Sequence, residues 1–293
     1  MSEGAVAGPA ITQILHEGAE RLIAAGIPRD EARAEVRTLL LHASGLSREA
    51  LHLRATESLS PDSQTAYLAL LARREQREPL AYLLGERAFY GRSFRVTPDV
   101  LIPRPETEFL VETVLAAARN IPQPRIVDIG TGSGVIAISL AAALPQARVW
   151  ATDISAAALA VARENADRLG VADRIAFREG DLLAGLTAEG PFEAIAANPP
   201  YIAPAEIKTL EPEVRDWEPS LALGTHPDAL HFYRRLAAEA PPLLAPDGIL
   251  AVEVGMGQAL EVVALWQDAG LADIDMVQDY AGIERVVFGR RVD

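Results

Sequence analysis

Val127-Asp128-Ile129-Gly130-Thr131-Gly132-Ser133-Gly134 is the stretch that decides the fold of most of this 293-residue chain. It places a glycine run where an apolar strand, Arg125–Ile129, ends and a helix from about Gly134 to Leu144 begins. Glycines at such a turn let a ligand approach the backbone without meeting Cβ atoms. Because similar runs also form tight turns that bind nothing, the surrounding segments decide its meaning.

The sequence of this loop argues against a dinucleotide ligand and excludes a P-loop. In the dinucleotide-binding pattern G-x-G-x-x-G the third glycine would stand at Val135, whereas here it comes one residue earlier. A P-loop is excluded because no Gly-Lys-Ser/Thr follows to neutralise a triphosphate. The loop therefore predicts a nucleotide-like ligand without a phosphate chain, such as S-adenosylmethionine.

Strand and helix patterns alternate after this loop, which is typical of a doubly wound α/β domain. A second helix is expected to begin with Ser155 as its N-cap. The remaining strands are expected at Ala147–Asp153, Ile175–Glu179, Glu193–Ala197 and Ile249–Val254, followed by an antiparallel hairpin of Ile274–Val277 and Arg285–Phe288.

Apolar residues recur at helical spacing from Ile11 to about Leu84, which predicts a small all-α bundle. Its helices are broken at Gly26-Ile27-Pro28 and at Ser60-Pro61, where Ser60 is the expected N-cap. A short hairpin and three prolines then lead into the α/β region. We therefore expect a helical domain over residues 1–86, a hairpin linker over 87–104 and an α/β domain over 105–293.

Composition narrows the function. Lys and Arg number 27 against 41 Asp and Glu, a formal charge of −14 with no basic run, which argues against direct binding to nucleic acid. The absence of cysteine excludes disulfides and thiolate sites, and the five histidines lack the spacing of a metal site. The N-terminus lacks the pattern of a signal peptide, and the sequence lacks an apolar stretch of the roughly 20 residues that span a bilayer. We expect a cytoplasmic protein with no metal and no membrane contact.

Two aspartates follow the second and third strands of the expected sheet. Asp153 comes about twenty residues after the glycine loop, where a carboxylate can accept the ribose hydroxyls. It is also placed to cap a helix, but Ser155 already fills that position. Asp181 could accept the amino group of adenine while Leu182 covers the ring, although a solvated loop aspartate explains the same pattern.

The sharpest signal is Asn198-Pro199-Pro200-Tyr201, at the carboxyl end of the fourth strand, where open α/β sheets bind ligands. The prolines lack N–H donors, which leaves the side-chain oxygen of Asn198 and the carbonyl of Pro199 as acceptors for an NH2 group. Tyr201 is then expected to stack on a flat substrate. The lone pair of an amide or aromatic amine is delocalised, so such acceptors favour attack on a sulfonium methyl without a metal or strong base.

These motifs together resemble those of the HemK/PrmC family, which methylates the glutamine of the Gly-Gly-Gln motif in class I peptide chain release factors. The resemblance extends to the following segments: Pro79–Gly85, Phe89–Gly91, Leu101–Glu108, Asp128–Gly134, Asn198–Tyr201 and Ala281–Val287.

The resemblance implies a helical domain that helps to bind the release factor. It also implies a Rossmann-like class I methyltransferase domain with a mostly parallel seven-stranded sheet, which converts S-adenosyl-L-methionine to S-adenosyl-L-homocysteine. The residues implied to bind the cofactor are Gly130, Thr131, Gly132, Ser133, Gly134, Asp153, Asp181, Leu182 and Asn198. The glutamine amide is implied to bind at Asn198, Pro199, Pro200 and Tyr201, with Asn198, Pro199 and Tyr201 taking part in catalysis.

One segment departs from the family pattern. Where the family commonly has a glycine-rich turn, this chain has Gly224-Thr225-His226-Pro227-Asp228-Ala229-Leu230, whose Thr and Ala resist positive φ. The sequence also leaves three other functions open. The chain could methylate a glutamine of a ribosomal protein, it could methylate adenine N6 in DNA after base flipping, or it could be a non-catalytic adaptor.

Overall fold

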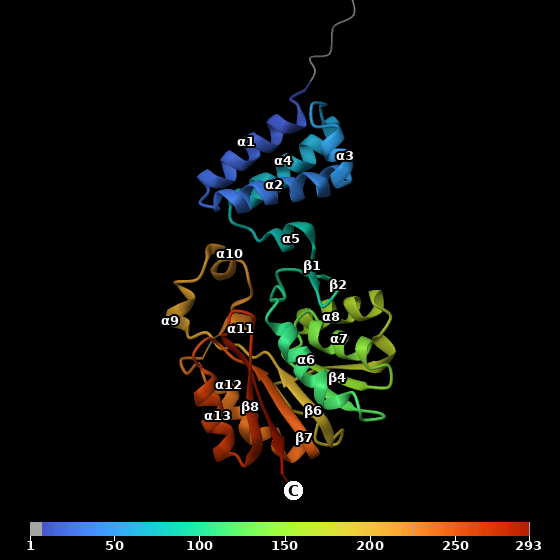
Figure 1. Cartoon of the computed structure of the whole chain (residues 1–293), viewed down its shortest axis with the longest axis vertical. Coiled ribbons are helices and arrows are strands. Elements are labelled where there is room, and N and C mark those ends of the chain that lie inside the picture. The colour runs from blue at the N-terminus through green and yellow to red at the C-terminus, as the bar shows by residue number, and fades with distance from the viewer. Residues whose placement is uncertain (1–7, 225, 293) are drawn as a thin grey trace, which may run out of the picture. The chain divides into compact units, whose positions relative to one another are not determined.

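The helical periodicity of the N-terminal region produces a bundle (Figure 1). The structure is a computed structural model that describes residues 8–224 and 226–292. Its helices are α1 (Ile11–Ala24), α2 (Arg29–Ser44), α3 (Arg48–Leu53), α4 (Pro61–Glu75) and α5 (Leu80–Leu84). As expected, Ser60 is the N-cap of α4, and its hydroxyl accepts a hydrogen bond from the backbone N–H of Ser63 at 3.2 Å.

The chain divides into two units, and the smaller one is not continuous in sequence. It contains residues up to Gly85 together with Pro212–Trp217, a segment that includes helix α10 (Pro212–Arg215). Arg74 is buried in this unit and pairs with Glu35 (Nε to Oε2, 2.8 Å) and with Glu213 (Nη1 to Oε1, 2.9 Å). Because breaking a buried ion pair leaves an uncompensated charge, these contacts hold the distant segment firmly in the unit.

The larger unit contains Glu86–Glu211 and the chain from Glu218 onward. It starts with a hairpin of β1 (Glu86–Phe89) and β2 (Arg92–Arg95), so the predicted linker hairpin packs as part of this unit. Within the described residues its main sheet has seven strands in the order β5-β4-β3-β6-β7-β9-β8. Their bounds are β3 (Arg125–Ile129), β4 (Arg148–Asp153), β5 (Ile175–Glu179), β6 (Phe192–Ala197), β7 (Leu244–Glu253), β8 (Leu271–Gln278) and β9 (Glu284–Arg291).

The sheet is mostly parallel, with an antiparallel hairpin at one edge. Strands β5, β4, β3, β6 and β7 pair in parallel, whereas β9 is antiparallel to both β7 and β8. The sequence-based expectation of a doubly wound sheet closed by an antiparallel hairpin is confirmed. The order of the strands reverses between β3 and β6, and open α/β sheets bind ligands at such a reversal.

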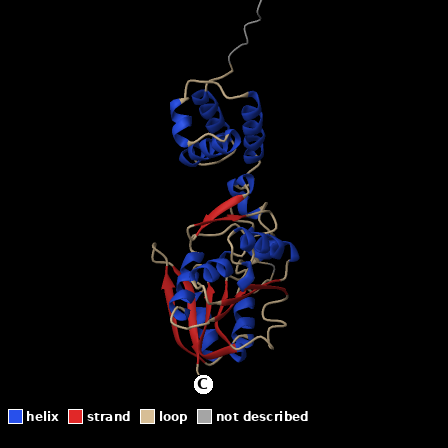
Figure 2. Cartoon of the chain, turned by 90° about the vertical axis from the view of Figure 1, so that its right-hand side faces the viewer, coloured by secondary structure: helices blue, strands red, loops and turns tan. Residues whose placement is uncertain are grey.

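Helices cover both faces of the sheet (Figure 2). One core joins alternate strand residues such as Ile126 and Ala194 to α6 and α7, and the other joins Val127 and Ile195 to α12 and α13. The larger helices of the unit are α6 (Thr107–Ala118), α7 (Val135–Ala143), α8 (Ala156–Arg168), α12 (His231–Glu239) and α13 (Ala259–Asp268). Short helical segments are α9 (Pro204–Ile207), α11 (Ser220–Leu223), η1 (Ala172–Arg174) and η2 (Pro241–Leu243). No helix within the described ranges is long and apolar enough to cross a bilayer.

Two details differ from the sequence-based expectation or add to it. Strand β7 starts at Leu244, five residues before the predicted start, because its pairing with β6 continues across a register shift between Phe192 and Ala194. In the atypical turn, a Cβ on Gly224 would lie 2.0 Å from the carbonyl oxygen of Ile202. This turn therefore requires glycine at its first position, while residue 225 lies outside the described residues.

Candidate active site

A cavity of about 180 Å³ opens at the carboxyl ends of β3, β4 and β6. Its walls bring together most of the residues that the sequence singled out, listed here: Gly130, Gly132, Asp153, Asp181, Leu182, Asn198 and Pro200. The predicted residues that do not line it are Thr131, Ser133, Gly134, Pro199 and Tyr201. One wall is Asp99–Leu101, just before the Arg104–Glu108 segment of the family motif.

The glycine loop forms a cradle on one side of this cavity. Gly130 and Gly132 both have positive φ, +66° and +55°, and the positions where a Cβ would project are open. Such a bare backbone surface fits a ligand that lies directly against the loop, as the sequence predicted. Gly134 is needed for a different reason, which is the packing of α7 on α8. A Cβ at this position would lie 2.8 Å from Ile138 and 3.2 Å from Ala162.

The Thr131 side chain and the Ser133 backbone shape the loop from within. The Thr131 hydroxyl donates to Oδ2 of Asp128 at 2.6 Å, and the same oxygen accepts from the Ala137 backbone at 3.0 Å. Burial raises the pKa of Asp128 to about 7. The carbonyl of Ser133 accepts from the Asn165 side chain at 2.9 Å. Thr131 and Ser133 therefore fix the loop's shape.

Asp153 already holds the loop and still has capacity for a ligand. Its Oδ2 accepts from the Gly132 backbone and its Oδ1 from the Ser155 backbone, each at 2.9 Å. Each carboxylate oxygen has a second acceptor site. Since Asp153 lines the cavity at the end of β4, hydroxyl groups of a ligand can bind to those remaining sites.

Asp181 and Leu182 lie at the cavity beyond β5. Leu182 is buried with φ +50°, which presents it to the cavity beside Asp181. Both carboxylate oxygens of Asp181 lie 2.8 Å from Nη1 of Arg235 on α12. The structure thus gives Asp181 a cationic partner that the sequence did not indicate, and an amino group of a ligand would share the carboxylate with it.

Asn198 is held by a chain of hydrogen bonds that reaches the end of β7. Its Nδ2 donates to the hydroxyl oxygen of Thr107 at 3.2 Å, and the Thr107 hydroxyl donates to Oε2 of Glu253 at 2.6 Å. Thr107 and Glu253 are both buried. Burial, the largest influence, raises the pKa of Glu253 to about 7, while the bond from Thr107 opposes the rise.

The direction of this chain fixes the orientation of the Asn198 amide. A hydroxyl has one hydrogen, and the 2.6 Å contact directs that of Thr107 to the carboxylate of Glu253. While Glu253 is ionised, Thr107 can therefore only accept from Asn198, which then turns its NH2 group toward Thr107. Within the described residues no donor reaches Oδ1 of Asn198 or the carbonyl of Pro199. Both oxygens of the predicted amide site are free.

The rest of the Asn198–Tyr201 segment is held by Glu253 at the end of β7 and by Gln258 after it. The Tyr201 hydroxyl lies 3.4 Å from Oε1 of Glu253, and its carbonyl accepts from Nε2 of Gln258 at 3.1 Å. Burial raises the pKa of Tyr201 well above its ordinary value, so the phenol stays neutral. The Tyr233 hydroxyl donates to the Glu253 carbonyl at 3.0 Å. These contacts hold Tyr201 beside the cavity, and stacking on a substrate stays a prediction.

Thr107 and Glu253 are site residues that the sequence analysis did not single out. Thr107 stood inside the Leu101–Glu108 segment of the family motif, to which the sequence analysis assigned no site residue. Glu253 had a clear signal, because it is the one charged residue in the apolar strand pattern of Ile249–Val254. A lone carboxylate at the carboxyl end of a buried parallel strand is rarely structural, since burying it costs free energy. Among the described residues, no group of three or more acidic or histidine side chains is arranged to bind a metal.

Comparisons with known proteins cover most of the chain. Residues 13–85 match the family model described as the PrmC N-terminal domain, and residues 105–211 match the methyltransferase small domain. The release factor glutamine methyltransferase of Cereibacter sphaeroides is 45% identical over 276 residues, which cover 94% of this chain and 96% of that protein. That of Geobacter sulfurreducens is 44% identical over 261 residues, covering 89% and 90%.

A solved structure supports the fold independently. A methyltransferase from Pyrococcus furiosus matches 70% of this chain and 91% of its own with a TM-score of 0.52, at 17% identity. At that identity the match supports the fold alone and carries no inference about substrate.

Proposed function

Because the chain belongs to the family of release factor glutamine methyltransferases, we propose that it transfers a methyl group to the side-chain nitrogen N5 of the glutamine in the Gly-Gly-Gln motif of class I release factors. Its family membership makes it a methyltransferase. The cofactor, the partner and the roles of individual residues are the parts that we propose. We also place the reaction in the cytoplasm, in keeping with a chain that has no cysteine.

We assign S-adenosylmethionine to the cavity lined by the glycine loop. The bare backbone of Gly130 and Gly132 fits a ligand in close contact, and Asp153 has acceptor sites for ribose hydroxyls. Leu182 offers an apolar contact for an adenine ring, and Asp181 an acceptor for its amino group. When bound, S-adenosylmethionine supplies a methyl group on a positively charged sulfur that is open to in-line attack.

The amide orientation of Asn198 is the observation on which the proposed substrate rests. A primary amide presents two N–H donors, and two acceptors are available: Oδ1 of Asn198, a residue that lines the cavity, and the carbonyl of the next residue, Pro199. Binding both N–H groups there orients the nitrogen toward the methyl group and favours positive charge as the new N–C bond forms. Pro200 and Tyr201 flank this position.

The proton balance needs no strong base. The amide nitrogen forms a bond to the methyl carbon while the bond from that carbon to sulfur breaks, which leaves the nitrogen with a positive charge. That nitrogen is then strongly acidic and loses one N–H proton to water. Glu253 holds Thr107, and Thr107 holds Asn198, so we assign both a positioning role.

Transfer of labelled methyl to three purified acceptors tests the proposal. The acceptors are a class I release factor, the same factor with its Gly-Gly-Gln glutamine replaced by alanine, and unmethylated DNA. We expect label only on the intact release factor. Label on the glutamine variant would refute the assigned target, and label on DNA would favour an adenine N6 methyltransferase.

A further inference from the structure

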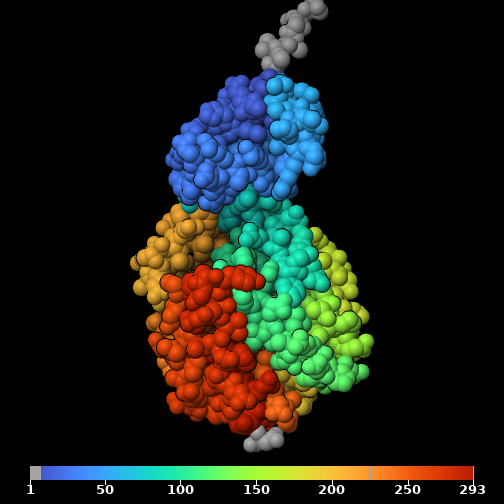
Figure 3. All heavy atoms as spheres, viewed as in Figure 1, coloured from blue at the N-terminus to red at the C-terminus, as the bar shows by residue number. Residues whose placement is uncertain are grey.

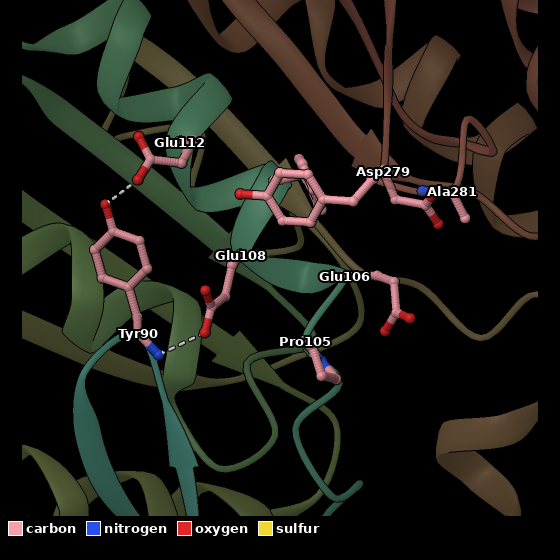
Figure 4. A pocket seen from close by; sticks show the side chains of 9 residues that line it. Tyr90, Pro105, Glu106, Glu108, Glu112, Asp279 and Ala281 are labelled. Atoms are coloured by element: carbon pink, nitrogen blue, oxygen red, sulfur yellow. Dashed lines mark hydrogen bonds between the residues drawn. The ribbon is translucent and has the colours of Figure 1, made fainter.

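A second cavity, of about 330 Å³, lies in the same unit and shares no lining residue with the cavity described above. Three separate segments form it: the turn of the β1–β2 hairpin, the start of α6 and the turn between β8 and β9 (Figure 4). The last two segments also meet on the surface of the unit (Figure 3). The lining residues are Tyr90, Pro105, Glu106, Glu108, Phe109, Glu112, Asp279, Tyr280 and Ala281.

This cavity carries an excess of negative charge. Of its four carboxylates, only Asp279 forms an ion pair among the described residues, with Nε of Arg285 at 2.8 Å, and the same guanidinium also interacts electrostatically with Glu106. Glu108 accepts from the Tyr90 backbone at 2.8 Å and Glu112 accepts from the Tyr90 hydroxyl, as Figure 4 shows. These neutral donors fix both carboxylates in place without cancelling their charge.

Aromatic rings provide a second, independent feature. Tyr280 is fully exposed, and its ring meets that of Phe109 edge to face at a centroid distance of 5.1 Å. A tyrosine held at the rim of a cavity with its ring in solvent offers a π face to a ligand. Such a face attracts cations, and carboxylates close by increase that attraction.

The position of the cavity relates it to the amide site. Glu106 lines it, and the next residue, Thr107, contacts Asn198. Consecutive Cα atoms lie about 3.8 Å apart. A residue only a few positions from the target glutamine can therefore reach the cavity while the glutamine amide is bound.

We propose that this cavity binds an arginine side chain of the protein substrate, close in sequence to the glutamine that is methylated. The inference rests on the proposed function, whose substrate is a protein. Arginine fits better than lysine because its planar guanidinium stacks on an aromatic ring and donates to several carboxylates at once. Its methylene groups are covered by Pro105 and Phe109.

Steady-state methyl transfer to a release factor tests the enzyme side. Tyr280→Ala removes the exposed ring, and Glu112→Gln removes a charge but keeps the oxygen that accepts from Tyr90. We expect each to raise KM for the release factor about fivefold, with kcat and KM for S-adenosylmethionine unchanged. The matched controls, Leu260→Ala and Glu261→Gln, change exposed residues of α13 and should leave KM unchanged. Unchanged KM in both cavity variants would overturn the proposal.

Substitutions in the substrate identify the occupant. Each arginine near the glutamine is replaced by glutamine in turn, and we expect one replacement to raise KM for the wild-type enzyme. The same replacement should add little when the enzyme carries Tyr280→Ala, because the interaction is already lost. Fully additive effects would show that the arginine binds elsewhere and would refute the assignment.

A binding measurement separates this inference from the proposed function. If the wild-type enzyme fails to label any release factor, the proposed function fails, but the cavity is still testable. Nα-acetyl-L-arginine amide is then titrated into the whole 293-residue chain and followed by NMR, alongside the Tyr280→Ala variant. Saturable binding that the variant loses supports an arginine site. Absence of saturable binding to the wild-type protein refutes it.

Discussion

Replacing Thr107 with valine is the sharpest test of how the amide site is oriented. The change preserves side-chain shape but removes the hydroxyl that links Asn198 to Glu253. In the wild-type protein this hydrogen bond favours the orientation that leaves Oδ1 of Asn198 free. In the variant the NH2 group of Asn198 would face a methyl group, so the amide is more stable when it turns this NH2 group toward the substrate. The NH2 group of Asn198 then faces the N–H donors of the substrate amide, and the hydrogen bond to Oδ1 is lost.

The size of the effect follows from the hydrogen bond that is lost and from the NH2 group that is left unpaired. The lost hydrogen bond stabilised the correct orientation by about 1 kcal/mol, and leaving the NH2 group unpaired costs at least about 1 kcal/mol more. A shift of about 2 kcal/mol changes the ratio of the two orientations by about thirtyfold. We expect kcat/KM for the release factor to fall by up to about that factor, while the dissociation constant of S-adenosylmethionine stays unchanged.

The assay is methyl transfer to a purified release factor, with cofactor affinity measured separately by calorimetry. Thr107→Ser is the control, because serine retains the hydroxyl, and it should recover most of the activity. A Thr107→Val enzyme as active as Thr107→Ser would refute the reasoning, since the hydroxyl would then have no part in orienting Asn198. If the variant were unfolded, which a thermal unfolding measurement would show, both kcat/KM and cofactor binding would be lost.

Three further predictions concern the same unit. Because burial raises the pKa of Glu253 to about 7 from 4.5, the carboxylate that orients Thr107 forms only as pH rises through 7, so kcat/KM should increase there. The contribution of Glu253 to the free energy of unfolding should change in the opposite sense, because a raised carboxyl pKa stabilises the fold below about pH 4.5 and this contribution is lost as pH rises through 7. A Glu253→Gln enzyme whose kcat/KM still rises through pH 7 would contradict the role assigned to the carboxylate. Asn198→Ala should retain cofactor binding but lose methyl transfer. Asp153→Ala should instead weaken cofactor binding at least tenfold, which is on the order of one hydrogen bond to a charged group. Calorimetry measures the cofactor affinity and the transfer assay measures activity, and an active Asn198→Ala enzyme would rule out the mechanism. Gly224→Ala should lower the free energy of unfolding by about 2 kcal/mol or more, because the new Cβ would lie 2.0 Å from the Ile202 carbonyl oxygen, and an unchanged denaturation midpoint would show that the turn tolerates a side chain.

Local sequence patterns predicted the fold of both units well. Strands with apolar runs and helices with caps such as Ser60 and Ser155 depend mainly on residues within a few positions of each other. The glycine loop and the Asn198–Tyr201 segment were recognisable for the same reason, since the backbone they require is set by their own residues. Their place at the carboxyl ends of strands then followed from the alternation of strands and helices.

Contacts between residues far apart in sequence could not be predicted from such local patterns. The sequence analysis assigned the helical domain to one continuous segment, whereas Glu213, 139 positions after Arg74, is held by a buried ion pair in the same unit. It also proposed that Asp181 binds a ligand but did not identify the ion pair of Asp181 with Arg235, 54 positions later. Neither pairing has a periodic signal, because each depends on how separate elements pack.

What the sequence by itself determined was the order of elements, the glycine loop and the two acceptors of the proposed amide site, because each depends on short-range backbone constraints of glycine and proline. Only the tertiary structure decided which way the amide of Asn198 points. That direction depends on Thr107, 91 positions away, and on Glu253, 146 positions beyond Thr107. The pairing of β6 with β7 and the packing of α6 on the sheet bring the three together, and the single hydrogen of the Thr107 hydroxyl then sets the polarity of the chain.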